Sequence, residues 1–448
     1  MSARSAKSVS SLHFDEATTR SKLINQALIA AGWNVGVNGA STDAVGQEVK
    51  VTGMPNKTGE GFVDYVLYDQ SGRPLAVVEA KRTAKSVDEG EKQAKLYADC
   101  LQNATGHRPL IFLANGFQIK FVDELNDYPR RDLYGFYSPD SLAYRIHQAA
   151  NKKALAHVPP TLSIADRMYQ LEAIKRVAER FTDKHRRALV VQATGTGKTQ
   201  VAIAICDVML RAGWAKRILF LADRRALVKQ ATREFAKFLP EVAPVNLLTD
   251  RRAEGRIYMS THATMLNLIN EGMGKEHRFG VGHFDLVIID EAHRSVFRKY
   301  RAIFEHFDSL LVGLTATPRE EIDRNTYDLF DLQPGVPTDA YPLAEAVADG
   351  YLVPPRAVSL TTRFLDRGVR YDDLTSEEQE RWDAEELDDE AEDGHIESGA
   401  MNRWLFNTDT VDKVIENLMT KGIHVAGGDR LGKTIIFAKN NDHAIFIA

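Results

Sequence analysis

A short apolar strand that runs into a glycine-rich turn and continues as an apolar helix limits the folds open to this chain. The segment is LVVQATGTGKTQVAIAI, residues 189–205. Gly195 and Gly197 let the backbone approach a ligand, and the amide groups of the turn and of the helix N-terminus supply partial positive charge. Such a loop binds phosphate between a strand and a helix of an α/β sheet. The segment therefore predicts a nucleotide-binding α/β domain.

The residues of this loop predict ATP and Mg²⁺ as ligands. Lys198 can reach the β and γ phosphates, and the Thr199 hydroxyl can bind Mg²⁺. Gln192 stands where the usual pattern opens with glycine, but the phosphate-facing part, TGTGKT, is intact. The other nucleotide-binding residues that we expect in the loop are Thr194, Gly195, Thr196 and Gly197.

A second apolar strand, FDLVIID, delivers two carboxylates to the same site. Asp290 and Glu291 lie at its carboxyl end, where ligands collect in sheets of this kind. We expect Asp290 to hold Mg²⁺ and Glu291 to orient or deprotonate the attacking water. His293 follows in the sequence DEAH; it either couples this site to the rest of the domain or makes only a local bond at a helix start.

Five short apolar strands predict the sheet that carries these loops. Separated by helical segments, they lie at residues 188–191, 217–221, 256–260, 285–290 and 310–315. Fully apolar strands that alternate with helices indicate a parallel, doubly wound sheet. We therefore predict an α/β lobe over residues 159–340.

As a set, these motifs resemble superfamily 2 helicases and translocases, which implies that the lobe is RecA-like. Gln170 in YQLEAI matches the adenine-reading glutamine of that family, although a plain helix residue stays open as an alternative. Thr315 and Thr317 in LTATP would couple the state of ATP to the grip on nucleic acid. LADRRALVKQ and STHATM resemble backbone-touching elements, yet a solvated or capping role stays equally open for their residues Arg224, Lys229 and Thr261.

The first 158 residues predict a smaller α/β domain. Helices are expected at residues 11–33, 89–102 and 142–155, and strands at residues 62–68, 75–81, 110–114 and 118–122. Asn115-Gly116 is a hairpin signal between the last two strands. The domain boundary is placed at Pro159-Pro160, where the last helix has ended.

Two carboxylates and a lysine stand out in the first hairpin of this domain. With Ser71-Gly72 at the tip, residues whose numbers sum to 143 face each other, so Asp64 lies opposite Glu79. Glu79 and Lys81 are two apart in a strand and share a face. Two carboxylates this close repel unless a cation joins them. Mg²⁺ held by Asp64, Glu79 and the Ala80 carbonyl could activate water for attack on a phosphodiester, with Lys81 stabilising the developing charge.

This pattern resembles the PD-(D/E)xK nuclease core in its D–x₁₄–ExK form. A surface hairpin with an unrelated Asp and a Glu–Lys pair is the alternative. QAKLY follows, and Gln93 and Tyr97 share a helix face; they match the QxxxY element of the RecB-like branch and could hold DNA or the lysine. Glu16 would be a helix-borne acid on the metal side, or simply an acid that a helix N-terminus favours.

A nuclease joined to such a motor resembles the restriction (R) subunit of type I restriction–modification enzymes. The phrases EATTRSKLI, GFVDYVL, VVEAKRT, QATGTGKT and YPLAEAVADGYLVPP carry the resemblance over nearly the whole chain. It implies ATP-driven movement on double-stranded DNA, Mg²⁺-dependent cleavage, and a complex with methyltransferase (M) and specificity (S) subunits. Recognition of a DNA sequence would belong to S, and S-adenosylmethionine to M.

Composition bounds the remaining possibilities. No run of about 18 apolar residues and no secretory signal are found, so a cytoplasmic protein without membrane spans is expected. Cys100 and Cys206 fall in different predicted domains, which argues against a disulfide or a zinc site. The net charge is −5, but residues 372–397 carry −13 and the rest +8. That acidic segment is expected to be a solvated insertion, and the modest basic excess elsewhere suits a chain that binds phosphates.

The end of the chain predicts an incomplete motor. Residues 341–430 are expected to form a connector with the acidic insertion, and residues 431–448 the start of a second RecA-like lobe with KTIIFA, residues 433–438, as its first strand. A chain that lacks the arginines of that lobe is expected to bind ATP with little hydrolysis. Two other hypotheses remain: a helicase whose N-terminal domain is an inert DNA clamp, and a chain that only occupies partners or DNA.

Overall fold

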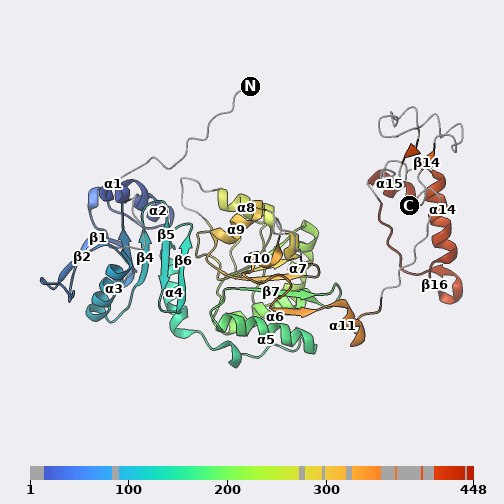
Figure 1. Cartoon of the computed structure of the whole chain (residues 1–448), viewed down its shortest axis with the longest axis horizontal. Coiled ribbons are helices and arrows are strands. Elements are labelled where there is room, and N and C mark those ends of the chain that lie inside the picture. Colours follow the sequence, from blue (N-terminus) through green and yellow to red (C-terminus); the bar gives the residue numbers. More distant parts are fainter. Residues whose placement is uncertain are drawn as a thin grey trace, which may run out of the picture. The chain divides into compact units, whose positions relative to one another are not determined.

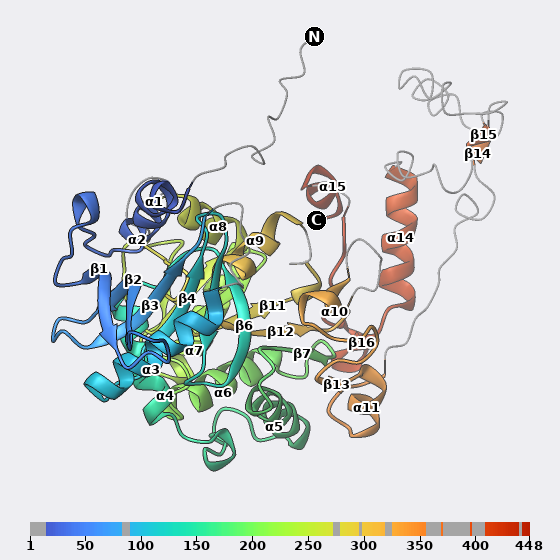
Figure 2. The same cartoon turned by 60° about the vertical axis from the view of Figure 1, so that its left-hand side comes forward.

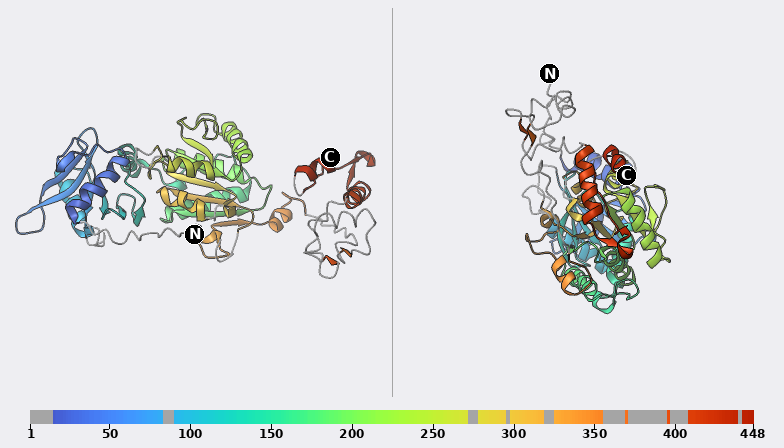
Figure 3. Two further views of the ribbon diagram at one scale, coloured as in Figure 1. Left: turned by 90° about the horizontal axis from the view of Figure 1, so that it is seen from above. Right: turned by 90° about the vertical axis from the view of Figure 1, so that its right-hand side faces the viewer.

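The computed structural model divides into two compact units, Met1–Pro354 and Pro355–Ala448 (Figure 1). The structure describes residues 15–82, 90–271, 278–294, 298–318, 325–354, 369–370, 395–396, 408–438 and 441–448. The first unit contains two sheets, each with its own helices; Figure 3 shows them in blue and in green to orange. Across the described residues, no helix is long and apolar enough to cross a membrane.

The first sheet has six strands in the order in which they occur in the chain. Only β3 and β4 pair in parallel, and the other neighbours are antiparallel. The parallel pair needs a crossover, which α3, Glu91–Thr105, provides. The strands are β1 Val45–Thr52, β2 Glu60–Tyr68, β3 Pro74–Ala80, β4 Leu110–Ala114, β5 Ile119–Asp123 and β6 Tyr128–Leu133.

Helices cover both faces of this sheet and bury its apolar side chains. The N-terminal helical segment comprises α1 Glu16–Thr19, a π-helical turn at Arg20–Ile24 and α2 Asn25–Ala30. It packs with α4, Pro139–Asn151, on one face, whereas α3 packs on the other. β3 is buried at every position because helices lie over both of its faces, and it is this strand that carries Glu79.

The second sheet has seven parallel strands in the order β13-β7-β12-β11-β8-β10-β9. This order places β7 and β11 on either side of β12, so the phosphate loop and the acidic pair emerge at neighbouring strand ends. The mixed α/β class with a parallel sheet is thereby confirmed. The strands are β7 Arg187–Gln192, β8 Ile218–Ala222, β9 Val245–Asn246, β10 Ile257–Thr261, β11 Leu286–Asp290, β12 Leu310–Thr315 and β13 Asp339–Tyr341.

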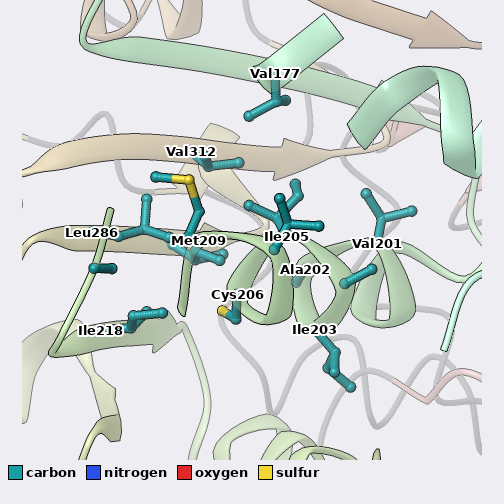
Figure 4. Close-up of a cluster of buried hydrophobic side chains, with 14 of the residues drawn as sticks. Val177, Val201, Ala202, Ile203, Ile205, Cys206, Met209, Ile218, Leu286 and Val312 are labelled. Carbon is teal, nitrogen blue, oxygen red and sulfur yellow. The ribbon is translucent and has the colours of Figure 1, made fainter. Parts of the chain in front are cut away.

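Helices cover the two faces of the second sheet (Figure 2). On one face lie α5 Met168–Thr182, α6 Lys198–Arg211 and α7 Arg225–Phe238. On the other lie α8 His262–Asn270, α9 Arg298–His306 and α10 Thr326–Leu329. Figure 4 shows part of the first of these cores, with Val201, Ile205 and Met209 along α6 and Val312 on β12. Cys206 lies in this core, and both cysteines are free, as predicted.

A buried cluster of charged side chains joins the two sheets of the first unit. The Arg131 guanidinium on β6 donates to both carboxylate oxygens of Asp308, each at 2.7 Å. Arg186 beside β7 donates to the same carboxylate at 2.6 Å, and the Tyr137 hydroxyl donates to it as well. Burial raises the pKa of Asp308, but the guanidinium groups of Arg131 and Arg186 outweigh burial and hold that pKa well below its usual range.

Most expected elements of the first unit are present, but four strands are additional. β1 and β6 extend the first sheet, and β9 and β13 extend the second; β13 lies across the boundary between the predicted lobe and the predicted connector. That connector also forms α11, Leu343–Ala348. The predicted boundary near residue 158 falls between the two sheets, inside the first compact unit, so the proposed domain limits stay a prediction.

The second unit differs from its prediction at one point. It contains β14 Val369–Arg370, β15 His395–Ile396, α14 Thr408–Lys421, β16 His424–Val425, β17 Arg430–Leu431 and α15 Asn441–Ile447. The expected strand at residues 433–438 is wrong: this segment is not a strand, and Ile435 and Phe437 are 80% and 91% exposed. An apolar strand needs neighbours to pair with, and no described strand pairs with this one. Most of the acidic segment 372–397 lies outside the described residues.

Candidate functional site

The phosphate loop joins the end of β7 to the start of α6. Gly195 and Gly197 have φ values of 91° and 89°, which side chains rarely adopt. A Cβ atom on Gly197 would lie 2.5 Å from the Gln200 amide oxygen and 2.7 Å from the Gln170 amide nitrogen. The conformation therefore requires glycine there, and both glutamine side chains would have to move to admit a side chain at this position.

Contacts within the loop hold it ready for a ligand. The buried Thr196 hydroxyl donates to the Ala193 carbonyl at 2.7 Å. The Lys198 ammonium donates to the Gln192 carbonyl at 3.3 Å, so the lysine lies folded over its own loop. Thr194 is exposed, whereas Thr199 is half-buried in the first turn of α6. The loop thus presents amide groups, one ammonium and one hydroxyl around a single turn.

Two residues of α5 support the loop from behind. The Gln170 side chain is 1% exposed and donates to the Thr196 carbonyl at 3.0 Å. The Tyr169 hydroxyl donates to the same carbonyl at 2.7 Å, and its ring stacks on Tyr341 of β13 at 3.9 Å between centroids. The sequence predicted Gln170 as a reader of adenine. In the structure its amide contacts the loop backbone, and the supporting tyrosines were not predicted.

The acidic pair lies at the end of β11, next to the phosphate loop. Glu291 has a φ of 53°, and its amide donates to the Asp290 carboxylate at 3.1 Å. Burial and the neighbouring Glu291 raise the pKa of Asp290 to about 6, although Lys198 acts in the opposite direction. The Asp290 carboxylate and the Thr199 hydroxyl are hard oxygen donors of the kind that Mg²⁺ prefers.

His293 connects this pair to the strand that carries LTATP. Its Nδ1 atom lies 3.0 Å from the Thr315 hydroxyl on β12 and 3.5 Å from Glu291. The Thr315 hydroxyl also accepts from the Thr317 amide at 3.2 Å. The histidine therefore does more than make a local bond at a helix start, and all three predicted coupling residues lie in one chain of contacts.

The three expected DNA contacts differ in exposure. The side chains of Arg224 and Lys229 are exposed at the start of α7. Thr261 is 6% exposed, and its hydroxyl caps α8 by accepting from the Thr264 amide. The structure thus favours the capping alternative for Thr261.

The hairpin of the first sheet has the predicted register. Tyr65 pairs with Val78 and Leu67 with Ala76, so facing residues sum to 143, with a bulge beyond Leu67. This register sets Asp64 across from Glu79. One oxygen of Asp64 accepts from the Ala80 amide at 2.7 Å, which brings the carboxylate to the end of β3.

Glu79 and Lys81 meet on the same face, as expected. The Lys81 ammonium lies 2.6 Å from a Glu79 carboxylate oxygen, and the Glu79 side chain is 3% exposed. Gly90 closes the site: a Cβ atom there would lie 2.6 Å from Glu79 and 3.0 Å from Lys81. In the described part of the chain, no three His, Cys, Asp or Glu side chains are spaced as a metal cluster. A metal here would combine two carboxylates with the main-chain oxygen of Ala80.

The predicted supporting residues lie on α3, beside the hairpin. The Gln93 amide donates to the Tyr97 hydroxyl. Burial raises the pKa of Tyr97, and the nearby carboxylates of Glu79 and Asp64 raise it further, whereas the Gln93 hydrogen bond and Lys81 lower it. Glu16 is the first residue of α1, but its side chain lies outside the described part of the structure.

Two further charged residues reach this site without having been predicted. The Arg20 guanidinium donates to Asp64 at 3.1 Å and to Glu48 at 2.9 Å. Arg20 lies in the π-helical turn, and Glu48 has a φ of 51° within β1. The pattern of apolar residues predicts neither irregularity. The opposite charges of Arg20 and Glu48 were therefore the only sequence signal for their contact.

Two family models match the chain over the regions that hold these sites. Residues 41–130 match the model described as type I restriction enzyme R protein N terminus. Residues 163–320 match the model described as type III restriction enzyme, res subunit. The first range includes Asp64, Glu79 and Lys81, and the second includes the phosphate loop and the acidic pair.

Similar whole proteins point in the same direction. The chain is 28% identical over 470 residues to the type I restriction enzyme EcoAI endonuclease subunit of Escherichia coli, which covers 96% of this chain and 53% of that protein. It is 26% identical to the EcoKI endonuclease subunit of Escherichia coli (strain K12), which covers 88% of this chain and 39% of that protein. The chain thus spans about half the length, or less, of these relatives.

A solved structure is also similar to the chain. It is a fragment described as an HsdR subunit of a type I restriction enzyme from Vibrio vulnificus, with 28% identity, a TM-score of 0.34, and coverage of 76% of this chain and 62% of that one. Together, the family models and the curated relatives confirm the resemblance to type I restriction enzyme R subunits, with an N-terminal nuclease region and a helicase-like region.

Proposed function

We propose that this chain supplies the nuclease and the first motor lobe of a type I restriction enzyme R subunit. In the complete protein, ATP-driven movement on double-stranded DNA would be coupled to Mg²⁺-dependent endonucleolytic cleavage. One observation carries the proposal: a single compact unit holds a phosphate loop beside an acidic pair, and also a hairpin that brings two carboxylates and a lysine together.

ATP would bind at the phosphate loop. The loop amides and Lys198 would contact the phosphates, and Thr199 and Asp290 would hold Mg²⁺, which neutralises charge on the phosphates when it is bound. Glu291 would orient or deprotonate the attacking water. His293 touches both Glu291 and Thr315, so the state of the γ phosphate can reach the strand end that carries Thr317.

Cleavage would take place at the hairpin. Asp64, Glu79 and the Ala80 carbonyl supply the oxygen donors that Mg²⁺ prefers, and the ion, when bound, lowers the pKa of a water. Lys81 would stabilise the negative charge that develops on the phosphodiester. Gln93 and Tyr97 would position the lysine or the DNA. Arg224 and Lys229 would contact the DNA backbone on the motor side.

The partners in this proposal are double-stranded DNA and the M and S subunits of a type I complex. The two relatives that align over most of this chain are named as endonuclease subunits of type I restriction enzymes, which supports a partnership of this kind. The alternative is a superfamily 2 helicase with a non-catalytic N-terminal DNA-binding domain. The contact between Lys81 and Glu79 favours the nuclease, because an inert clamp has no need of a lysine held against a buried carboxylate.

Two lysine variants separate the activities. Nicking of supercoiled plasmid DNA is measured with Mg²⁺, ATP and added M and S subunits, and nucleotide binding is measured with a fluorescent ATP analogue. Lys81→Ala should abolish nicking and leave nucleotide binding unchanged, whereas Lys198→Ala should abolish nucleotide binding. Arg82→Ala, an exposed neighbour of Lys81, is the matched control and should retain both activities. Nicking that persists in Lys81→Ala would favour the inert clamp, and DNA binding without any nicking would favour a chain that only occupies DNA.

A further inference from the structure

Three carboxylates lie in consecutive positions across the first sheet. Gln47 pairs with Tyr65 and Val49 with Val63, so Glu48 stands beside Asp64. The register between β2 and β3 sets Asp64 beside Glu79. β1 therefore places a third acidic residue, Glu48, beside the hairpin. The nuclease pattern has no position for this residue.

Arg20 connects two of these three acids, Glu48 on β1 and Asp64 on β2. Its two terminal nitrogens donate to one carboxylate each, at 2.9 and 3.1 Å. The guanidinium fork suits this, because its donors are held in one plane and can serve two acceptors at once. Burial lowers the pKa of Arg20, but Asp64 and Glu48 outweigh burial and keep that pKa above its ordinary value.

Two backbone irregularities place this pair. Arg20 begins the π-helical turn, a rare conformation that is frequent at functional sites. Glu48 adopts a φ of 51° in the middle of a strand, where an L residue is strained. Two independent departures from regular geometry thus meet at the Arg20 guanidinium, which contacts both Glu48 and Asp64.

A cation at Asp64 would meet Arg20 there. One oxygen of Asp64 accepts from the Ala80 amide and the other from the Arg20 guanidinium, so a cation on this carboxylate binds either beside the guanidinium or in its place. A guanidinium has no lone pair to offer a metal, and its charge opposes a divalent cation at close range. Arg20 and a metal therefore compete for the Asp64 carboxylate.

We propose that Arg20, anchored by Glu48, is a built-in competitor of the divalent cation at Asp64 and sets the metal affinity of the nuclease site. This inference rests on the proposed nuclease function and adds a positioning residue to it. Arg20 holds Asp64 in place before metal binds. When the cation binds, Glu48, which is 67% exposed at its side chain, keeps the arginine at the edge of the site.

Binding of Mn²⁺ alone tests the proposal, without DNA, nucleotide or turnover. Affinity is measured by electron paramagnetic resonance of free Mn²⁺ with the full chain, and every variant also carries Asp290→Asn, which removes the carboxylate of the nucleotide site. Arg20→Gln should bind Mn²⁺ about tenfold more tightly, because it removes both the competing donor and its charge. Glu48→Gln should bind more weakly, because it removes a negative charge and leaves Arg20 on Asp64.

Controls separate this inference from the nuclease proposal. Lys50 lies on β1, as Glu48 does, and forms a surface ion pair with Glu60 of β2. Lys50→Gln breaks that pair and should leave Mn²⁺ affinity unchanged. Asp64→Asn should abolish the binding; if it does not, the nuclease proposal itself fails. If Asp64→Asn abolishes binding but Arg20→Gln binds equally or more weakly, only the competition is wrong. If Arg20→Gln does not fold, Arg20→Lys takes its place in the test. Lysine keeps the positive charge but lacks the planar pair of donors, so this variant should bind Mn²⁺ with an intermediate affinity.

Discussion

The phosphate loop depends on residues that its own motif does not contain. Gln170 and Tyr169 reach it from α5. They lie 26 and 27 residues before Thr196, and both donate to the Thr196 carbonyl. Because that carbonyl belongs to the residue between the two glycines, it would otherwise be free to rotate. The two donors therefore fix the orientation of the peptide groups that a phosphate would meet.

Gln170→Ala should weaken nucleotide binding about two- to tenfold. The change removes one hydrogen bond of about 0.5–1.5 kcal/mol from the loop, while the Tyr169 hydroxyl still serves the carbonyl. Titration with a fluorescent ATP analogue measures the effect. Glu172→Ala on the same helix, which removes an exposed ion pair with Arg176, is the control. Equal affinities in the two variants would show that Gln170 does not support the loop.

His283 should make the protein less stable as the pH falls below neutrality. Burial, and then Arg217 and Arg278, lower its pKa to about 3, so the folded protein keeps it neutral. Between pH 6.5 and about 3 the unfolded chain takes up a proton that the folded chain does not. The stability that this group contributes is complete above pH 6.5 and is lost as the pH falls, by about 1.4 kcal/mol per pH unit.

Urea unfolding between pH 5 and 7.5 measures this slope. His283→Leu should reduce the slope of the unfolding free energy against pH by the equivalent of up to one bound proton. The exposed control His157→Leu should leave that slope unchanged. His262, whose pKa burial lowers to about 4, would maintain part of the slope in both variants. A slope in His283→Leu that equals that of the unchanged protein would contradict the assignment.

The residue scale also shows what the sequence could and could not predict. Asp64, Glu79 and Lys81 could be brought together by arithmetic, because a hairpin tip fixes the register and the register fixes which side chains face each other. Arg20 and Glu48 could not, because a π-helical turn and a left-handed strand residue follow no period. The contact of Gln170 with its loop was hidden as well, since it depends on how α5 packs against β7.

At the scale of elements, apolar content decided which strands were predictable. β4 and β12 begin and end where their apolar runs do. β1 was missed because polar residues outnumber apolar ones in its segment QEVKVT. β13 was missed because prolines lie on both sides of it. Residues 433–438 are apolar enough for a strand. A strand forms only where another strand can pair with it, however, and amino-acid composition does not predict the pairing partner.

Close packing between elements gives a test of the second sheet. A Cβ atom on Gly313 of β12 would lie 2.2 Å from the ring of Phe330, which is fully buried. Gly313→Ala should therefore lower the free energy of unfolding by about 1–3 kcal/mol, as measured in urea. Gly280→Ala, where a Cβ atom meets nothing within 4 Å, should have no such effect. Gly313→Ala combined with Phe330→Leu should recover part of the loss; a loss without recovery would point to a different cause.

At the scale of the whole first unit, the two sheets are joined through Asp308. The carboxylate accepts from Arg131 on one side and Arg186 on the other. Removing its charge leaves the buried Arg186 without this ion pair, and Arg131 with Asp123 at 3.5 Å as its remaining carboxylate. Asp308→Asn should cost about 3–5 kcal/mol and split one unfolding transition into two, followed by circular dichroism and tyrosine fluorescence. Glu305→Gln, an exposed neighbour that contacts Tyr134, should leave a single transition. One unchanged transition in Asp308→Asn would mean that the sheets are joined by other contacts.

β13 has a practical consequence for anyone who expresses the second sheet and its helices as a separate fragment. Asp339–Tyr341 pairs with β7, the strand that leads into the phosphate loop, and Leu352 lies 3.3 Å from the position of a Cβ atom on Gly195. A recombinant fragment that ends at Leu332 would include β12 and α10 but not β13. It would expose the edge of β7, and an exposed strand edge promotes aggregation. The expression boundary should lie beyond Leu352.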